Sequence, residues 1–460
     1  MSVRAIVLAA GQGTRMKSER PKVVHEAAGR PLVGWVLDAA LGFEPDEVVV
    51  VVGHGADEVE AVLPDGVRTA VQAEQLGTGH AVMAALGEMG DVSADTVVVL
   101  PGDSPLLRSD TLAALVAAHR DGGHEATLLT AVLDDPFGYG RVIRDGERVV
   151  GIVEERDADE SQRAIQEVGV STYVFSGDAL VRGLRGIDRS NAQGEYYLTD
   201  VIGVLASSGR VGAMAVGDPV DTSGVNSHDQ LAEASAELRR RINHRWMLAG
   251  VWMQDPATTY IDAGVELEAG VRLYAGVHLE GTTTVGAGAE IGPDTFVRDS
   301  EVRADARIWY SVVRGAVVGE GATVGPYASL RAGTFMGPES KVGTFAETKQ
   351  TTLGRKAKVP HLSYMGDATV GDEANIGAGT ITCNYDGVHK HRTVIGDRAF
   401  IGSDTMLVAP VEIGDEAYTG AGSVITRDVP PGSLAVERSA QKEIKGYARR
   451  RARVREAEDS

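Results

Sequence analysis

The segment 395–414, IGDRAFIGSDTMLVAPVEIG, returns to an aliphatic side chain at every sixth residue. This ladder consists of Ile395, Ile401, Leu407 and Ile413, and glycine follows three of the four. A six-residue period matches neither the α-helix, with about 3.6 residues per turn, nor the two-residue alternation of a strand. It is typical of a β-helix, in which each strand and turn form one flat side and the aliphatic side chains stack inside.

The same six-residue step continues upstream in further ladders. They are Val265, Val271 and Val277; then Val285, Ile291 and Val297; then Val312, Val318, Val324, Leu330, Met336 and Val342. We therefore predict an all-β, left-handed parallel β-helix of hexapeptide repeats over residues 251–460. The period fails across residues 384–392 and is irregular around 359–361, and segments that interrupt a rigid scaffold often carry function. The charged segment 441–458 is more typical of a solvated C-terminal helix than of a binding arm.

The first 228 residues have a different pattern. Short aliphatic runs, such as 5–8, 48–52 and 97–100, alternate with segments that favour helices. Unbroken apolar strands separated by helices indicate a parallel sheet covered on both faces, so we predict an α/β, Rossmann-like domain over residues 1–228. Residues 229–250 are rich in Ala, Glu, Arg and Leu and contain no proline. We expect them to form a helical linker between the two domains.

Composition excludes several classes of protein. The chain has 460 residues, 43% of them hydrophobic and 24% charged, with a net charge of −20. Such an acidic chain is not built to bind nucleic acid, although a local group of N–H donors and cations can still bind a small phosphorylated ligand. No apolar run reaches the roughly 18 residues that cross a bilayer, and no signal peptide is apparent. A single cysteine, Cys383, suits a reducing cytoplasm, and we interpret it as a small buried residue rather than a nucleophile.

The end of the first predicted strand has the features of a phosphate site. Residues 8–16 read LAAGQGTRM, and Pro21-Lys22 follows. A glycine-rich turn between a strand and a helix presents backbone N–H groups, which attract phosphate, and Arg15 and Lys22 add positive charge. The turn lacks the third glycine of the dinucleotide-binding fingerprint and is not a Walker loop.

Further motifs accompany this turn: QAEQLGTGHA at 72–81, GYGR at 138–141, GIVE at 151–154, YYLTD at 196–200 and GVN at 224–226. Together with the hexapeptide repeats, they resemble the bifunctional family of N-acetylglucosamine-1-phosphate uridylyltransferases and glucosamine-1-phosphate N-acetyltransferases over residues 3–445. The resemblance implies a cytoplasmic homotrimer that makes UDP-N-acetylglucosamine, a precursor of peptidoglycan and lipopolysaccharide, in cell-wall biogenesis and cell shape. It implies UTP and acetyl-coenzyme A as co-substrates and Mg²⁺ (or Mn²⁺) as cofactor.

The resemblance also assigns roles in the N-terminal domain. Asp103, which follows the aliphatic run 97–100, and Asn226 would be the metal ligands, while Arg15 and Lys22 would bind the triphosphate. Gln72, Gly77 and Thr78 would face the uracil, and Gly140 and Glu154 would hold the sugar. The complete set of nucleotide and sugar contacts implied is Leu8, Ala9, Ala10, Gly11, Lys22, Gln72, Gly77, Thr78, Gly102, Asp103, Gly140, Glu154, Gly169 and Asn226.

Two residues depart from the family pattern. Members of the family usually have Asn-(Ser/Thr)-Gly where this chain reads Gly169-Val170-Ser171, and that Asn helps to bind the acetamido sugar. Gly169 offers no side-chain hydrogen bond, whose loss typically costs about 1–3 kcal/mol when a buried polar ligand atom is left unpaired. Pro101 stands where an aromatic or small polar residue is common. The sugar preference is therefore less strongly indicated than the nucleotidyl transfer.

The C-terminal site needs a base, because a sugar ammonium must lose a proton before it attacks a thioester. Residues 361–367, HLSYMGD, resemble the catalytic stretch of the family, with His361 as base and Glu347 as the residue that holds its tautomer. Glucosamine phosphate would contact Arg331, Lys349, Tyr364, Asn375 and Lys390. Acetyl-coenzyme A would contact Ala378, Asn384, Tyr385, Ser403, Ala421 and Arg438, the small residues leaving room for the pantetheine arm.

Two alternatives remain open at this point. The chain could be a nucleotidylyltransferase for another sugar phosphate, with the β-helix serving only as an oligomerisation module, as Gly169 and Pro101 would allow. It could also be a hexapeptide scaffold without catalysis, which the joint presence of Arg15, Lys22, Asp103 and Asn226 argues against. Assays of thiol release from acetyl-coenzyme A and of pyrophosphate release from UTP separate these possibilities.

Overall fold

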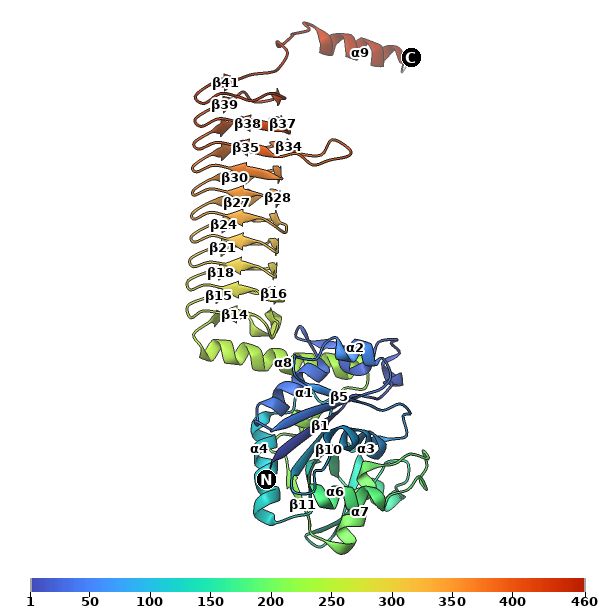
Figure 1. The fold of residues 1–460 in the computed structure, drawn as a ribbon. Coiled ribbons are helices and arrows are strands. Elements are labelled where there is room, and N and C mark those ends of the chain that lie inside the picture. Colours follow the sequence, from blue (N-terminus) through green and yellow to red (C-terminus); the bar gives the residue numbers. More distant parts are fainter. Residues whose placement is uncertain (1, 459–460) are drawn as a thin grey trace. The chain divides into compact units, whose positions relative to one another are not determined.

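The chain divides into two compact units, Met1–Ile242 and Asn243–Ser460, and the computed structural model describes residues 2–458 (Figure 1). The division falls within the long helix α8 (His228–Leu248), which occupies most of the segment in which a helical linker is expected. Among residues 2–458, no helix combines the length and the apolar character needed to cross a membrane.

The first unit is built on a nine-stranded sheet with the strand order β11-β7-β10-β6-β1-β4-β5, to which the hairpin β8–β9 is added through β10. The strands are β1 (Val3–Leu8), β4 (Glu47–Val52), β5 (Arg68–Val71), β6 (Thr96–Pro101), β7 (Ala126–Val132), β8 (Gly140–Asp145), β9 (Arg148–Val153), β10 (Glu167–Ser176) and β11 (Val211–Ala215); β2 (Glu26–Ala27) and β3 (Arg30–Pro31) form a separate two-stranded sheet. The α/β fold is the one expected from the sequence.

The expectation of a parallel sheet is wrong at β10 and at the hairpin β8–β9, which pair in antiparallel fashion. β1 runs parallel to β4 and β6, but β10 is antiparallel to both β6 and β7. A parallel return needs a crossover that packs on the sheet, usually a helix. Between β7 and β10 the chain instead forms the hairpin β8–β9 and only the short helix α5 (Glu160–Arg163), and it re-enters the sheet in the opposite direction.

Alternate residues of the central strands point to opposite faces of the sheet, and both faces are covered by helices. Ile6, Val49 and Val97 belong to one buried cluster with residues of α3 (Thr78–Met89), α6 (Gly177–Arg185) and α7 (Leu198–Ser208). Ala5, Val50 and Val98 belong to a second cluster with residues of α1 (Leu32–Leu41), α2 (Ala56–Glu60) and α4 (Ser109–Gly122). Burial on both faces explains why these strands read as continuous apolar runs.

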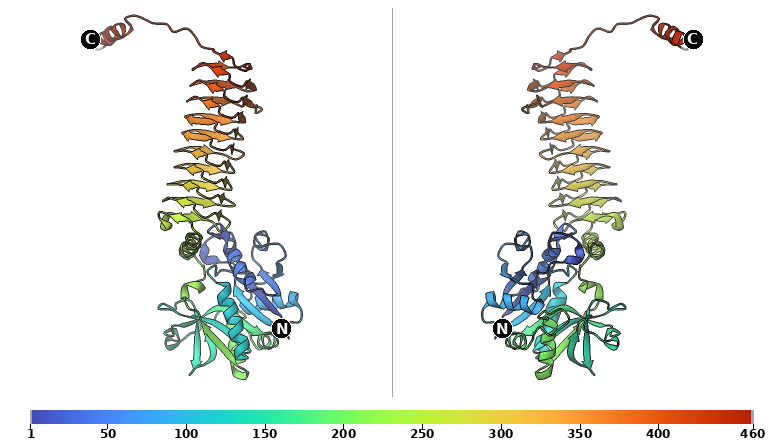
Figure 2. Two further views of the ribbon diagram at one scale, coloured as in Figure 1. Left: turned by 90° about the vertical axis from the view of Figure 1, so that its left-hand side faces the viewer. Right: turned by 90° about the vertical axis from the view of Figure 1, so that its right-hand side faces the viewer.

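The second unit is a left-handed parallel β-helix whose coils stack along one axis (Figures 1 and 2). Its first side consists of β12 (Trp252–Met253), β15 (Arg272–Leu273), β18 (Glu290–Ile291), β21 (Arg307–Ile308), β24 (Thr323–Val324), β27 (Lys341–Thr344), β30 (Lys358–His361), β33 (Asn375–Ile376), β36 (Phe400–Ile401), β39 (Tyr418–Thr419) and β41 (Leu434–Ala435). Its second side consists of β13 (Tyr260–Ile261), β16 (His278–Glu280), β19 (Phe296–Arg298), β22 (Val312–Arg314), β25 (Ser329–Leu330), β28 (Glu347–Lys349), β31 (Tyr364–Gly366), β34 (Ile381–Cys383), β37 (Met406–Val408) and β40 (Val424–Ile425). Its third side consists of β14 (Glu266–Leu267), β17 (Thr284–Val285), β20 (Glu301–Val302), β23 (Val317–Val318), β26 (Phe335–Met336), β29 (Thr352–Leu353), β32 (Ala368–Val370), β35 (Thr393–Ile395) and β38 (Val411–Ile413).

Two columns of inward-facing side chains fill the β-helix. The six-residue ladders identified in the sequence combine residues from both columns. The larger side chains, such as Leu273, Ile291 and Val313, are the second residues of their strands, and smaller ones, such as Ala289 and Ser311, stand two residues earlier. The ladder Val265, Val271, Val277 is buried, but it belongs to the column of the earlier positions. Val312 was placed in the interior, whereas its neighbour Val313 is the buried residue, because some sides of the coil take five residues instead of six.

The irregularity expected around residues 359–361 is also not a break in the period. Leu353, Val359 and Met365 all point into the interior, six residues apart, and β30 is merely longer than most strands of the β-helix. The real interruption lies between the buried Thr382 and Ile395, where residues 384–392 leave the coil as a loop closed by the antiparallel bridge Tyr385–Lys390. The exposed helix α9 (Tyr447–Glu458) occupies the charged C-terminal segment.

Candidate active sites

The first candidate site lies at the carboxyl ends of β1 and β6, the edge where open α/β sheets bind ligands. Leu8 pairs with Pro101 in register, and the Gly102 N–H donates to the Leu8 carbonyl at 2.9 Å, so the two strand ends lie side by side. The loops that follow them border a cavity of about 700 Å³. The sequence-predicted residues Leu8, Ala9, Ala10, Gly11, Lys22, Gln72, Gly77, Thr78 and Asp103 line it, together with Gln12, Gln75, Ser171 and Glu195.

One end of this cavity is held rigid by a turn between β5 and α3. Gln72 is buried and donates to the Gly77 carbonyl at 3.0 Å, and the Thr78 hydroxyl accepts the N–H of Leu198 at 3.0 Å. Gly77 has φ 102°, and a Cβ there would lie 2.6 Å from the Tyr196 carbonyl oxygen. Only glycine fits this position, which brings three sequence-predicted residues to one wall of the cavity.

Four sequence-predicted polar side chains meet where Lys22 and Asp103 border the cavity. The Lys22 ammonium pairs with Asp103 and donates to Asn226 Oδ1 at 2.8 Å, and the Arg15 guanidinium donates to the same oxygen at 2.7 Å. The Asp103 and Asn226 oxygens therefore converge on one positively charged group. Among residues 2–458, no three His, Cys, Asp or Glu side chains are grouped to hold a metal ion. Two oxygen donors nevertheless fit Mg²⁺, which usually takes one or two protein ligands together with phosphate and water.

A second, smaller hollow of about 200 Å³ shares Pro101, Asp103 and Ser171 with the first cavity. Its sequence-predicted residues are Arg15, Asp103, Gly140, Glu154, Gly169 and Asn226. Glu154 Oε1 accepts the Thr199 hydroxyl at 3.0 Å, and burial is the main cause that raises the pKa of this carboxyl group. A half-buried carboxylate next to a hydroxyl can bind the hydroxyl groups of a sugar.

Sequence reasoning missed several residues of this hollow. Tyr139 and Thr199 lie within motifs that had been recognised, so their positions in those motifs could have identified them. Ser171 belongs to the triplet 169–171, whose departure from the family pattern could have drawn attention to it, whereas Tyr173 carries no such signal and lines the hollow next to the register shift in β10. Gly102 lines neither cavity; a Cβ there would lie 2.7 Å from the Leu8 carbonyl oxygen, so it serves the close approach of the two strand ends.

The second candidate site follows one corner of the β-helix. The N–H of Gly379 donates to the His361 carbonyl at 3.4 Å, that of Asp404 to Ala378 at 2.7 Å, and that of Gly422 to Ser403 at 2.8 Å. His361, Ala378, Ser403 and Ala421 thus occupy equivalent places in successive coils, and the Arg438 guanidinium donates to the Ala421 carbonyl at 2.9 Å. With coils spaced like paired strands, at about 4.8 Å, His361 and Ala421 are roughly 14 Å apart. The exposed His361 therefore stands at one end of a column of small residues.

The cationic residues lie on the adjoining second side. Arg331 and Lys349 follow equivalent strand positions in neighbouring coils, and Tyr364 pairs with Glu347 in register. The Lys390 ammonium is the main cause that lowers the pKa of Lys349, which places the two like charges together. Such a pair of ammonium groups favours an anionic ligand between them.

Two predicted residues are arranged differently. Glu347 accepts a hydrogen bond from Arg331 at 2.9 Å, and within residues 2–458 no hydrogen bond joins it to His361, which lies on another side of the β-helix. Asn375 lies on the first side with His361, in register with Lys358. Asn384 is nearly buried and donates to Asp367, while Tyr385 is exposed on the loop and Cys383 is half-buried.

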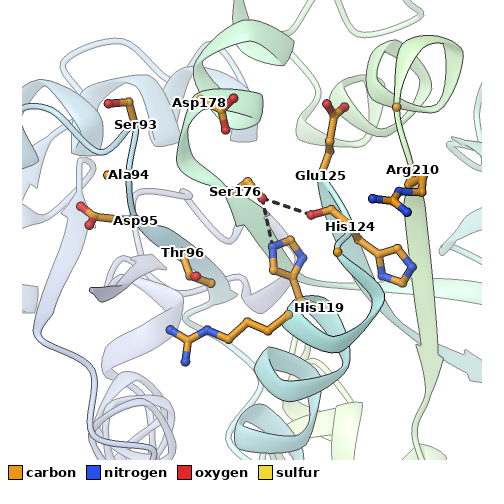
Figure 3. A pocket seen from close by; sticks show the side chains of 13 residues that line it. Ser93, Ala94, Asp95, Thr96, His119, His124, Glu125, Ser176, Asp178 and Arg210 are labelled. Atoms are coloured by element: carbon orange, nitrogen blue, oxygen red, sulfur yellow. Dashed lines mark hydrogen bonds between the residues drawn. The ribbon is translucent and has the colours of Figure 1, made fainter. Parts of the chain in front are cut away.

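A third cavity, of about 860 Å³, lies at the opposite end of the sheet in the first unit, and none of the sequence-predicted site residues lines it (Figure 3). Ser176 donates its hydroxyl proton to the His124 carbonyl at 3.1 Å, so it accepts from His119 Nε2, 3.3 Å away. His119 Nδ1 must then accept from the Thr127 hydroxyl at 3.0 Å, and Thr127 accepts from His124 Nδ1 at 3.2 Å. This closed circuit requires a neutral His119, and burial lowers the pKa of His119 to about 4.

Comparison with known proteins gives matches in both units. Residues 5–169 match the MobA-like NTP transferase domain, and residues 392–427 match the bacterial transferase hexapeptide family. The bifunctional protein GlmU of Streptomyces avermitilis is 52% identical over 97% of this chain and 94% of its own length. The protein of the same name from Kineococcus radiotolerans is 52% identical over 96% and 91%, and that from Heliobacterium modesticaldum is 50% identical over 95% and 96%.

Proposed function

This chain belongs to the family of the bifunctional GlmU proteins, and we propose that it makes UDP-N-acetylglucosamine in two steps at two separate sites. The second unit transfers an acetyl group from acetyl-coenzyme A to glucosamine-1-phosphate. The first unit then transfers a uridylyl group from UTP to N-acetylglucosamine-1-phosphate and releases pyrophosphate. The product serves the synthesis of peptidoglycan and other cell-wall polymers. Residues 1–228 form the uridylyltransferase domain, 229–250 the helical linker, and 251–460 the acetyltransferase domain.

In the first unit, nucleotide and sugar occupy the two adjoining hollows, and the reacting phosphates meet where these hollows join. Gln72, Gly77 and Thr78 bind the uracil in the larger hollow, and Glu154 binds hydroxyl groups of the sugar in the smaller one. Arg15 and Lys22 stand at the junction, where they stabilise the negative charge that develops on the leaving pyrophosphate. This division is supported by Pro101, Asp103 and Ser171, which line both hollows.

Asp103 and Asn226 would hold Mg²⁺ (or Mn²⁺) with their side-chain oxygens, which pair with Lys22 in this structure. When bound, the ion neutralises charge on the triphosphate and orients the attacked phosphate. Lys22 must leave at least one of these oxygens to make room for the ion. Its long, flexible side chain is free to turn toward the phosphates instead.

In the second unit, His361 accepts a proton from the ammonium group of glucosamine-1-phosphate, and the resulting amine attacks the thioester carbonyl. The carbon–sulfur bond then breaks, the nitrogen loses a second proton to become an amide, and coenzyme A takes up a proton and leaves as the free thiol. Arg331, Lys349 and Lys390 bind the sugar phosphate, with Tyr364 and Asn375 as hydrogen-bond partners. Acetyl-coenzyme A lies along the column of Ala378, Ser403 and Ala421, with Arg438 at its far end and Asn384 and Tyr385 beside it. The observation that carries this assignment is the single column shared by His361 and the small residues.

The sites in the second unit are shared between copies of the chain in a homotrimer. This proposal is supported by the placement of His361 and Asn375 on one side of the β-helix and of Arg331, Lys349 and Tyr364 on another. Exposed aromatic side chains on the β-helix, among them Tyr327 and Phe345, would be buried in such an assembly. We place the enzyme in the cytoplasm, where UTP and acetyl-coenzyme A are made.

Two assays on the purified full-length protein test the proposal. With Mg²⁺, UTP and N-acetylglucosamine-1-phosphate it should release pyrophosphate, and with acetyl-coenzyme A and glucosamine-1-phosphate it should release free thiol. Pyrophosphate release without thiol release would favour the alternative of a nucleotidylyltransferase with an inert β-helix. That alternative is not favoured, because the bifunctional relatives match the chain over both units.

A further inference from the structure

The departure at residues 169–171 changes which residue presents a polar side chain to the sugar hollow. Where the family has Asn-(Ser/Thr)-Gly, this chain has Gly169-Val170-Ser171. These residues lie in β10, whose pairing with β7 shifts register between Gly169 and Tyr173. Of these three residues, only Ser171 has a polar side chain.

The Ser171 backbone has a conformation that favours glycine. Its φ is 56°, in the left-handed region, where a residue with a Cβ is strained. In this chain the strained residue is the one that carries a hydroxyl group, although glycine would be the relaxed choice.

Ser171 is exposed to the junction of the two hollows. It lines both of them, as do Pro101 and Asp103, and the Glu154 carboxylate lines the smaller one. The buried Tyr173 contacts the Ser171 side chain; burial is the main cause that raises the pKa of the Tyr173 phenol, and a hydrogen bond with Ser171 opposes it. The Ser171 side chain therefore contacts Tyr173 on one side and borders the two hollows on the other.

The space next to Gly169, unlike that next to Ser171, is occupied by another side chain. A Cβ at this position would lie 3.2 Å from Ile152 Cδ1, so the isoleucine occupies the space next to it. This chain thus has an apolar contact where the family presents an amide, and a hydroxyl two residues further along the strand.

We propose that the Ser171 hydroxyl has replaced the missing amide at position 169 and determines the preference for a 2-acetamido sugar. The inference rests on the proposed uridylyl transfer. The junction is where the phosphate on sugar carbon 1 must lie, so the substituent on carbon 2 is the nearest sugar group to Ser171. A hydroxyl can donate to the acetamido carbonyl or accept from its N–H, as an amide side chain does.

The test compares Ser171→Ala and Ser171→Gly in the full-length protein. Pyrophosphate release from UTP in the presence of Mg²⁺ is measured with two sugars, N-acetylglucosamine-1-phosphate and glucose-1-phosphate. The second sugar lacks the acetamido group. In both variants kcat/KM for N-acetylglucosamine-1-phosphate should decrease by about 3- to 10-fold, and kcat/KM for glucose-1-phosphate should not change. The Tm of Ser171→Gly should rise, because the strain is relieved, while that of Ser171→Ala should not.

Glu44→Gly is the matched control, because the exposed Glu44 has the same φ of 56° and lines neither hollow. It should raise the Tm without changing the ratio of the two sugars. An unchanged ratio in Ser171→Ala would overturn the inference, as would an equal loss with both sugars, which would indicate a phosphate contact. A wild-type ratio in Ser171→Gly with a loss in Ser171→Ala would also overturn it, since the backbone would then be responsible. A wild-type protein inactive with both sugars would instead refute the uridylyl transfer itself.

Discussion

The Lys22 ammonium donates a hydrogen bond to Asn226 Oδ1 at 2.8 Å, although 204 residues separate the two along the chain. The same ammonium pairs with Asp103, so it binds both oxygens assigned to the metal ion. A metal ion bound at this proposed site would therefore compete with Lys22 for these oxygens. This competition gives Lys22 two opposing effects, one on metal binding and one on transfer.

Lys22→Met should separate these effects. Removing the ammonium leaves Asp103 unpaired, and Mn²⁺ should bind the protein without nucleotide more tightly, as measured by titration calorimetry. Uridylyl transfer should fall by about 100-fold or more, because a cation that stabilises the transition state is lost. Arg20→Met is the control, since Arg20 is exposed and its nearest carboxylate, that of Glu58, is 3.8 Å away. Weaker Mn²⁺ binding in Lys22→Met would show that the lysine does not compete for the site.

His361→Ala should abolish acetyl transfer and leave uridylyl transfer unchanged. A general base typically accelerates a reaction by about 100- to 10,000-fold, so the rate of thiol release should decrease by a factor in that range. His278→Ala is the control, because His278 lies on the same β-helix, stacked on Tyr260 with ring centroids 4.4 Å apart, and has no place in the corner column. Acetyl transfer retained by His361→Ala would refute its role as the base.

Gly169→Asn should lower the KM for N-acetylglucosamine-1-phosphate if the restored side chain reaches the hollow. The new Cβ would press on Ile152 Cδ1 at 3.2 Å, a contact that the end of a flexible side chain can yield. The double variant Gly169→Asn with Ile152→Val removes that methyl group and should give the larger decrease in KM. An unchanged KM in both variants would show that position 169 no longer faces the substrate in this chain.

Asp386→Ala should raise the KM for acetyl-coenzyme A. The Asp386 carboxylate accepts the N–H groups of Val388 and His389 at 2.8 and 2.6 Å, and His391 Nε2 lies 2.7 Å from it. The His389 N–H is the main cause that lowers the pKa of Asp386 to about 2, so this carboxylate is charged at neutral pH. Its loss should loosen the loop that carries Asn384 and Tyr385, and the KM should rise about 10-fold. The KM for UTP is the internal control and should not change. An unchanged KM for acetyl-coenzyme A in Asp386→Ala would contradict the assignment of this loop to acetyl-coenzyme A binding.

The stability of the first unit should fall between pH 6.5 and 4 because of His119. This side chain is 3% exposed, and burial lowers its pKa to about 4, so the folded protein keeps it neutral while the unfolded chain takes up a proton below about pH 6.5. The stability that neutral His119 contributes is complete above pH 6.5 and is lost as the pH falls toward 4, by at most about 3 kcal/mol.

Urea unfolding followed by hydrogen exchange in β7 measures this loss. His119→Gln should show a shallower dependence on pH than the wild type, since glutamine does not titrate. His54→Gln is the control, because His54 lies in a loop outside the hydrogen-bonded circuit. Equal slopes for His119→Gln and the wild type would show that His119 does not cause the pH dependence.

The sequence predicted the fold most securely where one physical rule repeats. The six-residue spacing of Ile395, Ile401 and Leu407 predicts the β-helix, because every coil must fill the same narrow interior with aliphatic side chains. The prediction failed at Val312, because a coil side can lose one residue at its turn without disturbing the stack. It also failed at β10, since apolar content alone does not give the direction of a strand.

The chain by itself determined the two kinds of architecture and the identity of most polar groups in the first site, because local periodicity and glycine-rich turns are written in neighbouring residues. Only the tertiary structure brought Lys22, Asp103 and Asn226 to one point, placed His361 in line with Ala378 and Ser403, and turned Ser171 toward the two hollows. These relationships depend on strand order, on the lengths of the coils and on a bulge in β10. Such features arise from packing between distant segments, which no local pattern of residues records.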